Sequence, residues 1–495
     1  MVKGYDVAVI GGGINGCGIA ADAAERGLSV ILLEKDDIGS KTSSNSSKLI
    51  HGGLRYLEYY DFSLVKKALD ERQLLLSLAP HLVYPTSFVL PYLQSMRPTW
   101  LLRTGLFLYD NLSRKNKLPR SRLIKRNKSP DYFRALNPEF SKGFLFSDCT
   151  TDDSRLTLVN ALLAKEYGAA ILPNTELIAA ETHNNQWMLR TRNKSQQVET
   201  VNAKVVINAA GPWVEPLNNL LGIESYYKIS MVQGSHFVVH KLYEGDHAYL
   251  LQNTDNRIVF VIPYHGHTMI GTTDVPFSGD LDHVAISPLE INYLFQLIRG
   301  YFKHHLTHGD IINTWSGVRP LLFKPGESPQ ALSRDYLFHL NQSPAPVITI
   351  YGGKITTYRQ LACEAIDQLK PVFPRLQPAS SAKIALPGAV LDSMSFNEYQ
   401  FHAKEIYHWL NPTILNRYLR SYGTRTEFIL ADCKKMTDLG ENIGHGLYTK
   451  EIDYLMGQEW ASCAEDILWR RTKLGLELSV QEKVKLENYC RQHGG

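Results

Sequence analysis

Several kinds of feature are scarce in this sequence, and each absence excludes a class of protein. The six cysteines are widely scattered, with no CxxC pair and no cluster of His and Cys at the spacing of metal ligands. We therefore expect no zinc site, no other metal and no structural disulfide, as in a reduced intracellular compartment. No run approaches the roughly 18 apolar residues that span a bilayer, so any membrane contact is expected at its surface.

Acidic residues are nearly absent from one segment. Between Arg97 and Lys128 the chain has ten Lys or Arg residues and a single acid, Asp110, although the net charge of the whole chain is only +4. Aromatic and apolar residues such as Trp100 and Phe107 are interleaved with these cations. The mixture favours contact with anionic lipid headgroups, whereas a solvated loop and a nucleic-acid surface are the alternatives. No RNA-binding motif supports the last alternative.

The first 34 residues have the pattern of a βαβ unit. Residues 5–10 form an apolar strand, residues 19–26 an Ala-rich helix and residues 28–33 a second buried strand, closed by Glu34. One Lys before an apolar run imitates a signal peptide, but Gly11, Gly13 and Gly16 match GxGxxG directly after the first strand. These glycines allow a tight turn and the close approach of a pyrophosphate, and Glu34 can accept from ribose hydroxyls. The unit predicts a dinucleotide site, with FAD and NAD both open.

Three loops further along the chain favour FAD. The stretch TSSNSSKLIHGGLRY, from Thr42 to Tyr56, has the composition of a linker, but its donors follow the acid where a long pyrophosphate and ribityl chain would pass. A strand over residues 201–208 enters the turn AAGPW, and a strand over 347–351 enters GGKITT before a helix over 357–369. A helix N-terminus at the last turn can stabilise negative charge on a reduced flavin.

The remaining periodicity predicts the organisation of the chain. Helical spacing over residues 61–78 ends at the prolines 80, 85 and 91, and residues 154–167 form another helix. Alternating segments between about 226 and 340 predict a mostly antiparallel sheet, and the chain from 385 onward is rich in helical patterns. With 495 residues, two or three domains are expected.

Nine segments occur in order and with compatible spacing over about residues 4–475: IGGGINGCGIAADAAERGLSVILLEKDD, TSSNSSKLIHGGLRYLEYYDF, NAAGPWV, RIVFVIPY, GTTDV, SGVRPL, SRDY, YGGKITTYR and ILWRRTKLG. Together they resemble the FAD-dependent, membrane-associated aerobic glycerol-3-phosphate dehydrogenases. Cys17 departs from the family pattern, in which a small Ala is more usual. The sequence shows neither a presequence nor a calcium-loop extension, which we expect of a bacterial enzyme.

The resemblance implies oxidation of sn-glycerol 3-phosphate to dihydroxyacetone phosphate, with electrons passing through FAD to ubiquinone or menaquinone. It also implies a homodimer attached peripherally to the cytoplasmic side of the inner membrane, with no nucleic acid as partner. A glycerol-3-phosphate oxidase that reduces oxygen to hydrogen peroxide shares these motifs and is the first alternative. An FAD-dependent RNA-modifying protein and a non-catalytic FAD-binding protein are more remote ones.

The fold class implied is α/β. A Rossmann-like FAD-binding domain of the glutathione reductase and D-amino-acid oxidase type is expected with an antiparallel-sheet substrate domain and an all-helical C-terminal cap. The predicted boundaries are 1–80, 145–220 and 345–372 for the discontinuous FAD-binding domain, 81–144 for a basic and aromatic membrane-facing insertion, 221–344 for the substrate domain and 385–495 for the C-terminal domain.

A phosphorylated secondary alcohol requires a receptor for its dianion and a group that takes the hydroxyl proton. The resemblance places Arg55, Arg319 and Arg334, with Tyr56 nearby, in the phosphate receptor, although an Arg in such motifs is more often in a surface salt bridge. Lys354 follows the third glycine turn, where its charge can stabilise a developing alkoxide. His236 and His51 are the candidate proton acceptors, and the sequence does not choose between them.

The predicted cofactor contacts lie in the three loops, the first glycine turn and one strand. They are Gly11, Gly13, Asn15, Gly16, Glu34, Thr42, Ser43, Ser44, Ser46, Ser47, Lys48, Leu49, His51, Gly52, Gly53, Leu177, Ala210, Gly211, Trp213, Gly353, Lys354, Ile355 and Thr356.

Overall fold

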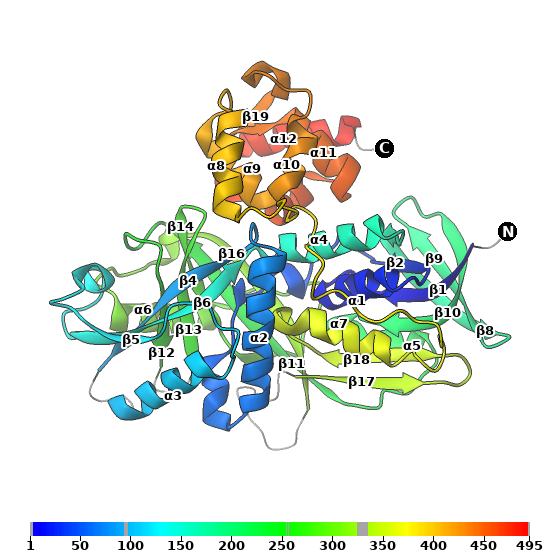
Figure 1. Cartoon of the computed structure of the whole chain (residues 1–495), viewed down its shortest axis with the longest axis horizontal. Helices are drawn as coiled ribbons and strands as arrows, with labels where there is room; N and C mark the ends of the chain where they lie inside the picture. The colour runs from blue at the N-terminus through cyan, green and yellow to red at the C-terminus, as the bar shows by residue number, and fades with distance from the viewer. Residues whose placement is uncertain (1–2, 94–97, 254, 256, 324–334, 494–495) are drawn as a thin grey trace.

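The computed structural model describes residues 3–93, 98–253, 255, 257–323 and 335–493. Two large sheets lie side by side, and a mainly helical C-terminal domain stands above them (Figure 1). No helix in the described part of the chain is long and apolar enough to cross a membrane.

The smaller sheet contains eight strands and begins with the predicted βαβ unit. Five neighbouring strands, β18-β10-β1-β2-β7, run parallel, while β17 and the β8–β9 pair are antiparallel additions. The strands are β1 (Lys3–Ile10), β2 (Val30–Leu33), β7 (Ala170–Leu172), β8 (Thr175–His183), β9 (Gln186–Asn193), β10 (Val198–Asn208), β17 (Tyr336–Asn341) and β18 (Val347–Gly352). The carboxyl ends of β1, β10 and β18 therefore lie at one edge, which is where an α/β sheet binds ligands.

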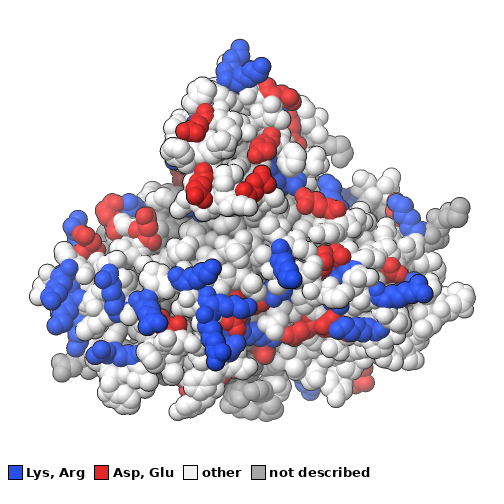
Figure 2. All heavy atoms as spheres, viewed as in Figure 1, with Lys and Arg blue, Asp and Glu red and all other residues white. Residues whose placement is uncertain are grey.

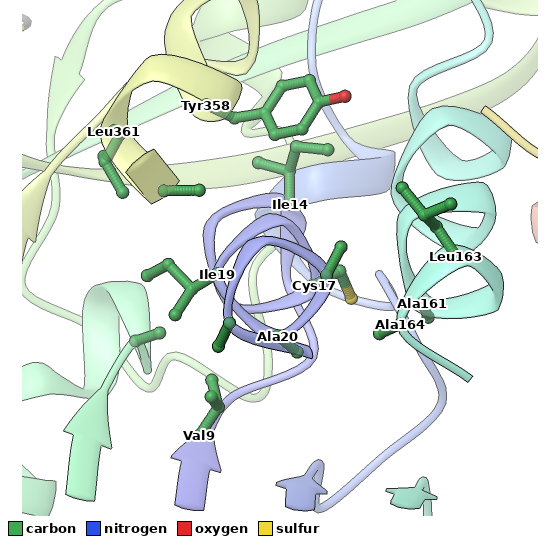
Figure 3. Close-up of a cluster of buried hydrophobic side chains, with 14 of the residues drawn as sticks. Val9, Ile14, Cys17, Ile19, Ala20, Ala161, Leu163, Ala164, Tyr358 and Leu361 are labelled. Atoms are coloured by element: carbon green, nitrogen blue, oxygen red, sulfur yellow. The ribbon is translucent and has the colours of Figure 1, made fainter. Parts of the chain in front are cut away.

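Helices α1 (Ile14–Glu25), α4 (Asp153–Glu166) and α7 (Tyr358–Asp367) pack together against this sheet. Figure 3 shows Cys17 of α1 directed toward Ala161 and Ala164 of α4, where small side chains let the helices approach. Cys17 is fully buried and its Sγ donates to the carbonyl of Gly12, so it serves here as a packing residue.

Helix α1 begins at Ile14, five residues before the position expected from propensity. Gly16 and Gly18 are poor helix formers, but both are required by close contacts. A Cβ on Gly16 would lie 1.9 Å from the carbonyl oxygen of Gly11, and a Cβ on Gly18 would lie 2.7 Å from the ring of Tyr358. Tertiary packing thus overrides propensity at this helix start.

The larger sheet has ten strands and is antiparallel except where β12 pairs with β4. Its strands are β3 (Leu49–Ile50), β4 (Val83–Tyr92), β5 (Arg122–Lys125), β6 (Lys142–Thr151), β11 (Ile229–Val239), β12 (Ala248–Gln252), β13 (Ile258–Tyr264), β14 (His267–Gly271), β15 (Val275–Pro276) and β16 (Ile311–Leu322). Helices α2 (Phe62–Leu78), α3 (Thr99–Asn111), α5 (Val214–Leu220) and α6 (Pro288–Tyr301) complete the body of the molecule.

The region 81–144, predicted as a basic and aromatic membrane-facing insertion, contributes strands to the larger sheet. Strands β4 and β5 belong to the larger sheet, so this region is built into the body of the protein. Pro85 and Pro91 lie within β4, because β12 pairs with that strand only at Phe88 and Val89 and needs no ladder donor elsewhere along it. The prolines end α2 as expected but do not prevent the strand that follows.

The C-terminal domain forms its own hydrophobic core. Its helices are α8 (Phe396–Ile406), α9 (Pro412–Tyr422), α10 (Thr426–Leu430), α11 (Thr449–Glu459) and α12 (Val480–His493). It is not entirely helical as predicted, because β19 (Asn442–Gly444) and β20 (Leu447–Tyr448) form a small hairpin. A π-helix, Asp466–Arg471, lies where this domain meets the body of the protein.

Candidate active site

A cavity of about 510 Å³ lies between the two sheets and will be called the central cavity. It extends from the first glycine turn, along the Thr42–Tyr56 loop, to strands of the larger sheet. The predicted site residues that line it are Gly11, Gly13, Asn15, Glu34, Thr42, Ser43, Ser46, Ser47, Leu49, His51, Gly53, Arg55, Tyr56, Leu177, Ala210, Gly211, Trp213, His236, Arg319, Gly353, Lys354 and Ile355. Segments distant in sequence are thus brought to one place.

The first glycine turn brings the backbone close to the cavity. Gly11 has φ +113°, and a Cβ there would lie 2.6 Å from the carbonyl oxygen of Ala209, so glycine is required. Gly13 is the N-cap residue of α1, and no side-chain hydrogen bond from this residue caps the helix. The N–H of Ile14 donates to Ser43 Oγ at 2.9 Å, which joins the turn to the hydroxyl-rich loop. This helix N-terminus favours negative charge.

Glu34 ends β2 beside that turn, as predicted. Its carboxylate accepts from the N–H of Gly12 at 2.6 Å and from the N–H of Asp36 at 2.8 Å. Burial raises the pKa of Glu34, and the two N–H donors partly offset that effect. The two backbone bonds fix the carboxylate in the cavity wall, where a carboxylate can accept from a ribose.

The third glycine turn meets the first across the cavity. Gly353 has φ +107°, and a Cβ there would lie 2.6 Å from Asn15 Nδ2. Asn15 Nδ2 donates to the carbonyl of Gly352 at 3.2 Å, while its Oδ1 has no partner within the described part of the chain. The chain then turns through a short helix, Ile355–Thr357, into α7. Two helix N-termini therefore face one cavity.

Among the described residues, the cavity lining contains five cations, Lys35, Lys41, Arg55, Arg319 and Lys354, and four carboxylates, Glu34, Asp148, Glu176 and Asp274. Arg319 Nη2 lies 2.6 Å from Asp274 Oδ1, and Arg55 Nη1 lies 3.8 Å from Asp274 Oδ2. Lys354 Nζ donates to the carbonyl of His51 at 3.0 Å and lies 5.3 Å from the centre of the Tyr56 ring. Counted over the described lining, the five cations exceed the four carboxylates by one positive charge.

His236 is the more enclosed of the two predicted proton acceptors. Its Nε2 lies 2.9 Å from Ser47 Oγ, its ring stacks on Trp315, and its Nδ1 has no partner among the described residues. Burial, followed by the charges of Lys48 and Arg319, lowers the pKa of His236 well below its usual value. The imidazole is therefore neutral at neutral pH. His51 also lines the cavity, with its ring edge on Phe260.

Five predicted cofactor contacts do not line the cavity. Ser44 Oγ donates to the carbonyl of Lys41, and Lys48 Nζ forms a buried ion pair with Asp153. The Gly52 N–H donates to the hydroxyl of Tyr109, and Thr356 Oγ1 bonds to the backbone of His51. These four hold the loops in place from behind. The fifth, Gly16, provides the close packing already described.

Other predictions had a different outcome. Arg334 lies outside the described residues. The sequence argument missed Asp274, although it stands in the quoted GTTDV motif. It also missed an apolar wall from the larger sheet, formed by Phe88, Phe146, Leu250, Ile258 and Phe260. Alternation along β4, β12 and β13 was the available signal for these side chains.

The cavity fits a flavin dinucleotide. The first turn and its helix N-terminus suit a pyrophosphate, Glu34 suits a ribose, and the apolar wall suits a flat ring. Asn15 Oδ1 and His236 Nδ1 are buried polar atoms without partners in the described chain.

Comparison with known proteins agrees with this geometry. A family model described as FAD dependent oxidoreductase matches residues 6–359, and one described as the C-terminal domain of alpha-glycerophosphate oxidase matches residues 379–487. In its fold and its site the chain is an FAD-dependent oxidoreductase, and FAD is its cofactor.

Curated relatives narrow the class. The chain is 48% identical to glycerol-3-phosphate dehydrogenase of Pseudomonas aeruginosa, covering 99% of this chain and 96% of that protein. It is 42% identical to aerobic glycerol-3-phosphate dehydrogenase of Escherichia coli (99% and 97% covered) and 43% identical to D-erythritol 1-phosphate dehydrogenase of Brucella abortus (97% and 96%). A crystal structure of glycerol-3-phosphate dehydrogenase from Bacillus halodurans with FAD shares the fold, with a TM-score of 0.77, 24% identity and 99% and 94% coverage. The chain belongs to the FAD-dependent glycerol-3-phosphate dehydrogenase family.

Proposed function

We propose that this protein oxidises sn-glycerol 3-phosphate to dihydroxyacetone phosphate and passes the electrons to a membrane quinone. The observation that carries the proposal is the placement of Arg55, Arg319 and Lys354 in one cavity with the predicted FAD loops. When bound, FAD supplies the acceptor for a hydride from carbon 2 of the alcohol. The residues of the chain bind the phosphate, orient carbon 2 and take the hydroxyl proton.

Phosphate recognition is assigned to the two arginines. A guanidinium presents several N–H donors in a plane that matches a phosphate, and Asp274 orients the guanidinium of Arg319 through the 2.6 Å ion pair. The same carboxylate faces Arg55. The two guanidinium groups carry one positive charge more than Asp274, which suits a phosphate anion. Unphosphorylated glycerol offers nothing to these donors and is expected to be a poor substrate.

Lys354 and a histidine handle the hydroxyl group. The Lys354 ammonium, held by the carbonyl of His51, can stabilise negative charge that develops on the oxygen as its proton leaves. His236 is neutral at neutral pH and lines the cavity, so it is the preferred proton acceptor. His51 is the alternative, because it lines the same cavity.

Two other outcomes compete with this substrate and acceptor. The relative that acts on D-erythritol 1-phosphate is about as similar as the aerobic glycerol-3-phosphate dehydrogenase, so a longer polyol phosphate is the second candidate substrate. An oxidase would give hydrogen peroxide in equal amount to the substrate consumed. A quinone-linked dehydrogenase would give little.

Attachment to an anionic membrane surface is proposed for the region around α3. Trp100 and Phe107 on this helix are 67% and 63% exposed, and cations cluster beside it between residues 103 and 128. Figure 2 shows Lys and Arg side chains gathered over the part of this face where β5 and α3 lie in Figure 1. Charge and exposed aromatic rings together favour shallow insertion among lipid headgroups. The homodimer stays a prediction.

One anaerobic titration tests the proposal. Glycerol 3-phosphate should bleach the flavin absorbance of the holoenzyme, glycerol should not, and a quinone analogue should restore the colour. Faster bleaching by D-erythritol 1-phosphate would show that this longer polyol phosphate is the substrate. Hydrogen peroxide formed in air in equal amount to the substrate consumed would show that oxygen is the electron acceptor. Failure of every phosphorylated polyol to bleach the flavin would overturn the proposal.

A further inference from the structure

The motif ILWRRTKLG has no residue in the central cavity, although the cations within it are among the buried groups of the C-terminal domain. The side chains of Arg471 and Lys473 are 1% and 3% exposed, and that of Arg470 is 12% exposed. Arg470 and Arg471 end the π-helix Asp466–Arg471, a form of helix frequent at functional sites. Besides contacts within the C-terminal domain, these cations pair with carboxylates in the FAD-binding part of the chain.

Arg471 holds the loop that follows Glu34. Its guanidinium forms a bidentate ion pair with Asp37, with Nη1 to Oδ2 at 2.5 Å and Nη2 to Oδ1 at 2.8 Å, and Arg470 Nε reaches the same carboxylate. Two residues beyond Asp37, the N–H of Gly39 donates to the carbonyl of Gly12 in the first glycine turn. The C-terminal domain therefore grips the loop that closes the dinucleotide turn.

Lys473 holds a second loop through the start of α4. Its Nζ donates to Asp152 Oδ1 at 2.7 Å and to the hydroxyl of Ser154 at 2.6 Å. Asp153, the next residue after Asp152, accepts from the N–H and the Oγ of Ser46 and from Lys48 Nζ.

Ser46 and its neighbour Ser47 line the central cavity, and Ser47 contacts His236. The ion pairs of Arg471 and Lys473 thus support two separate loops of the predicted FAD site. Among the described residues, Asp37, Asp152, Asp153, Arg471 and Lys473 do not line the cavity itself.

We propose that the C-terminal domain is a positioning element for FAD, and that Arg471 and Lys473 couple its docking to the affinity of the protein for the cofactor. Undocking this domain would free Asp37 and Asp152 and loosen the loops 35–41 and 46–48. Because coupling between two equilibria is reciprocal, FAD must in turn stabilise the docked C-terminal domain. The inference concerns the cofactor alone and does not depend on which alcohol is oxidised.

Two full-length variants test the coupling. Lys473→Met removes one cation and leaves the N–H of Arg155 as a donor to Asp152. The double variant Asp37→Asn with Arg471→Met removes both charges of the second pair, so that no carboxylate is left buried without a cation. We expect each to raise the dissociation constant for FAD by about 10-fold or more, measured by equilibrium ultrafiltration without substrate. Far-UV circular dichroism establishes that the variants are folded.

Arg425→Gln is the matched control. Arg425 pairs with Glu166 across the same domain boundary, at the far end of α4, away from both loops. The dissociation constant of the Arg425→Gln variant for FAD should stay within about twofold of that of the parent protein. Equal weakening in all three variants would overturn the assignment of the coupling to Arg471 and Lys473. Unchanged affinity in Lys473→Met and the double variant would overturn the coupling itself.

Hydrogen exchange gives the reciprocal test in the parent protein. Addition of FAD should slow exchange of the backbone amides in residues 459–476, and the effect should be smaller in Lys473→Met. Exchange in that segment that is the same with and without FAD would contradict the coupling, whatever the affinity measurements give.

Discussion

Asp274 and Arg319 form a 2.6 Å ion pair in the wall of the central cavity, and the second oxygen of the same carboxylate faces Arg55 at 3.8 Å. A carboxylate between two arginines lowers the net charge of the receptor but fixes the direction of the guanidinium groups. Arginines held in this way need less reorganisation when a phosphate binds. The arrangement therefore supports selectivity for a phosphorylated substrate over a neutral polyol.

Replacing Arg319 tests this receptor. Arg319→Ala should raise KM for glycerol 3-phosphate by about 10- to 100-fold, because hydrogen bonds to charged groups contribute about 1.5–3 kcal/mol. The flavin should stay bound, since Arg319 lies on β16 and is not one of the predicted cofactor contacts. Steady-state kinetics and the ratio of flavin to protein absorbance are the two measurements.

Arg134→Ala is the control for Arg319. Arg134 pairs with Asp131 on the surface, where the two side chains are 74% and 79% exposed, and loss of that pair should leave KM unchanged. Unchanged kinetics in Arg319→Ala would remove this residue from the substrate site.

The two histidines can be separated by substitution. If His236 accepts the hydroxyl proton, His236→Asn should lower kcat by about 100- to 10,000-fold, the usual contribution of a general base. His51→Asn should have the smaller effect, and both variants should keep FAD. The measurement is the rate of flavin bleaching in single turnover, which isolates the chemical step from reoxidation. The reverse order of the two effects would assign the proton to His51.

Much of the cofactor side of the site could be predicted from the sequence, because its signals are local. Glycines after a buried strand, an acid at the end of the next strand and a glycine turn before a helix each specify a backbone shape within a few residues. The structure places Gly11, Glu34 and Gly353 in one cavity. The turns could be predicted because each depends on its own short segment.

The remainder depends on contacts between residues far apart. Composition marks the Thr42–Tyr56 loop as rich in donors, but it does not say that Lys48 points away to Asp153. The pairing of Asp37 with Arg471 joins residues 434 apart, and no local pattern encodes it. Strand β4 was missed for the same reason, since its prolines are tolerated only because of the short pairing with β12.

Acid should destabilise this protein before its carboxylates are titrated. Burial lowers the pKa of His81 to about 3, that of His247 to about 4 and that of His236 well below its usual value of about 6.5. The unfolded chain binds these protons near pH 6.5 and the folded protein does not. Stability is therefore complete above about pH 6.5 and falls as the pH drops toward the folded pKa values, by about 1.4 kcal/mol per pH unit for each histidine.

Urea unfolding at about pH 7, 6 and 5, followed by tryptophan fluorescence, measures this loss. His81→Leu should reduce the fall in the free energy of unfolding with decreasing pH by the contribution of one histidine. His81 is 1% exposed, and both of its ring nitrogens lack partners among the described residues. A decline of the same steepness in the variant and the parent would show that His81 does not contribute.

The basic surface beside α3 provides the last prediction. The six cations Arg114, Lys115, Lys117, Arg120, Arg122 and Lys125 are all exposed, and changing them to Gln should abolish sedimentation with anionic vesicles at low salt. Each Lys or Arg near such a surface contributes about 1 kcal/mol, and salt should weaken binding of the parent because the charges are screened. Trp100→Ala with Phe107→Ala should weaken binding but keep the salt dependence, because these side chains contribute burial and no charge.

The control is Lys404→Gln with Lys434→Gln, which changes two exposed cations of the C-terminal domain. That domain lies at the opposite end of the molecule from α3 (Figure 1), so this variant should sediment like the parent. Sedimentation of the six-residue variant at the level of the control would rule out this surface as the lipid contact.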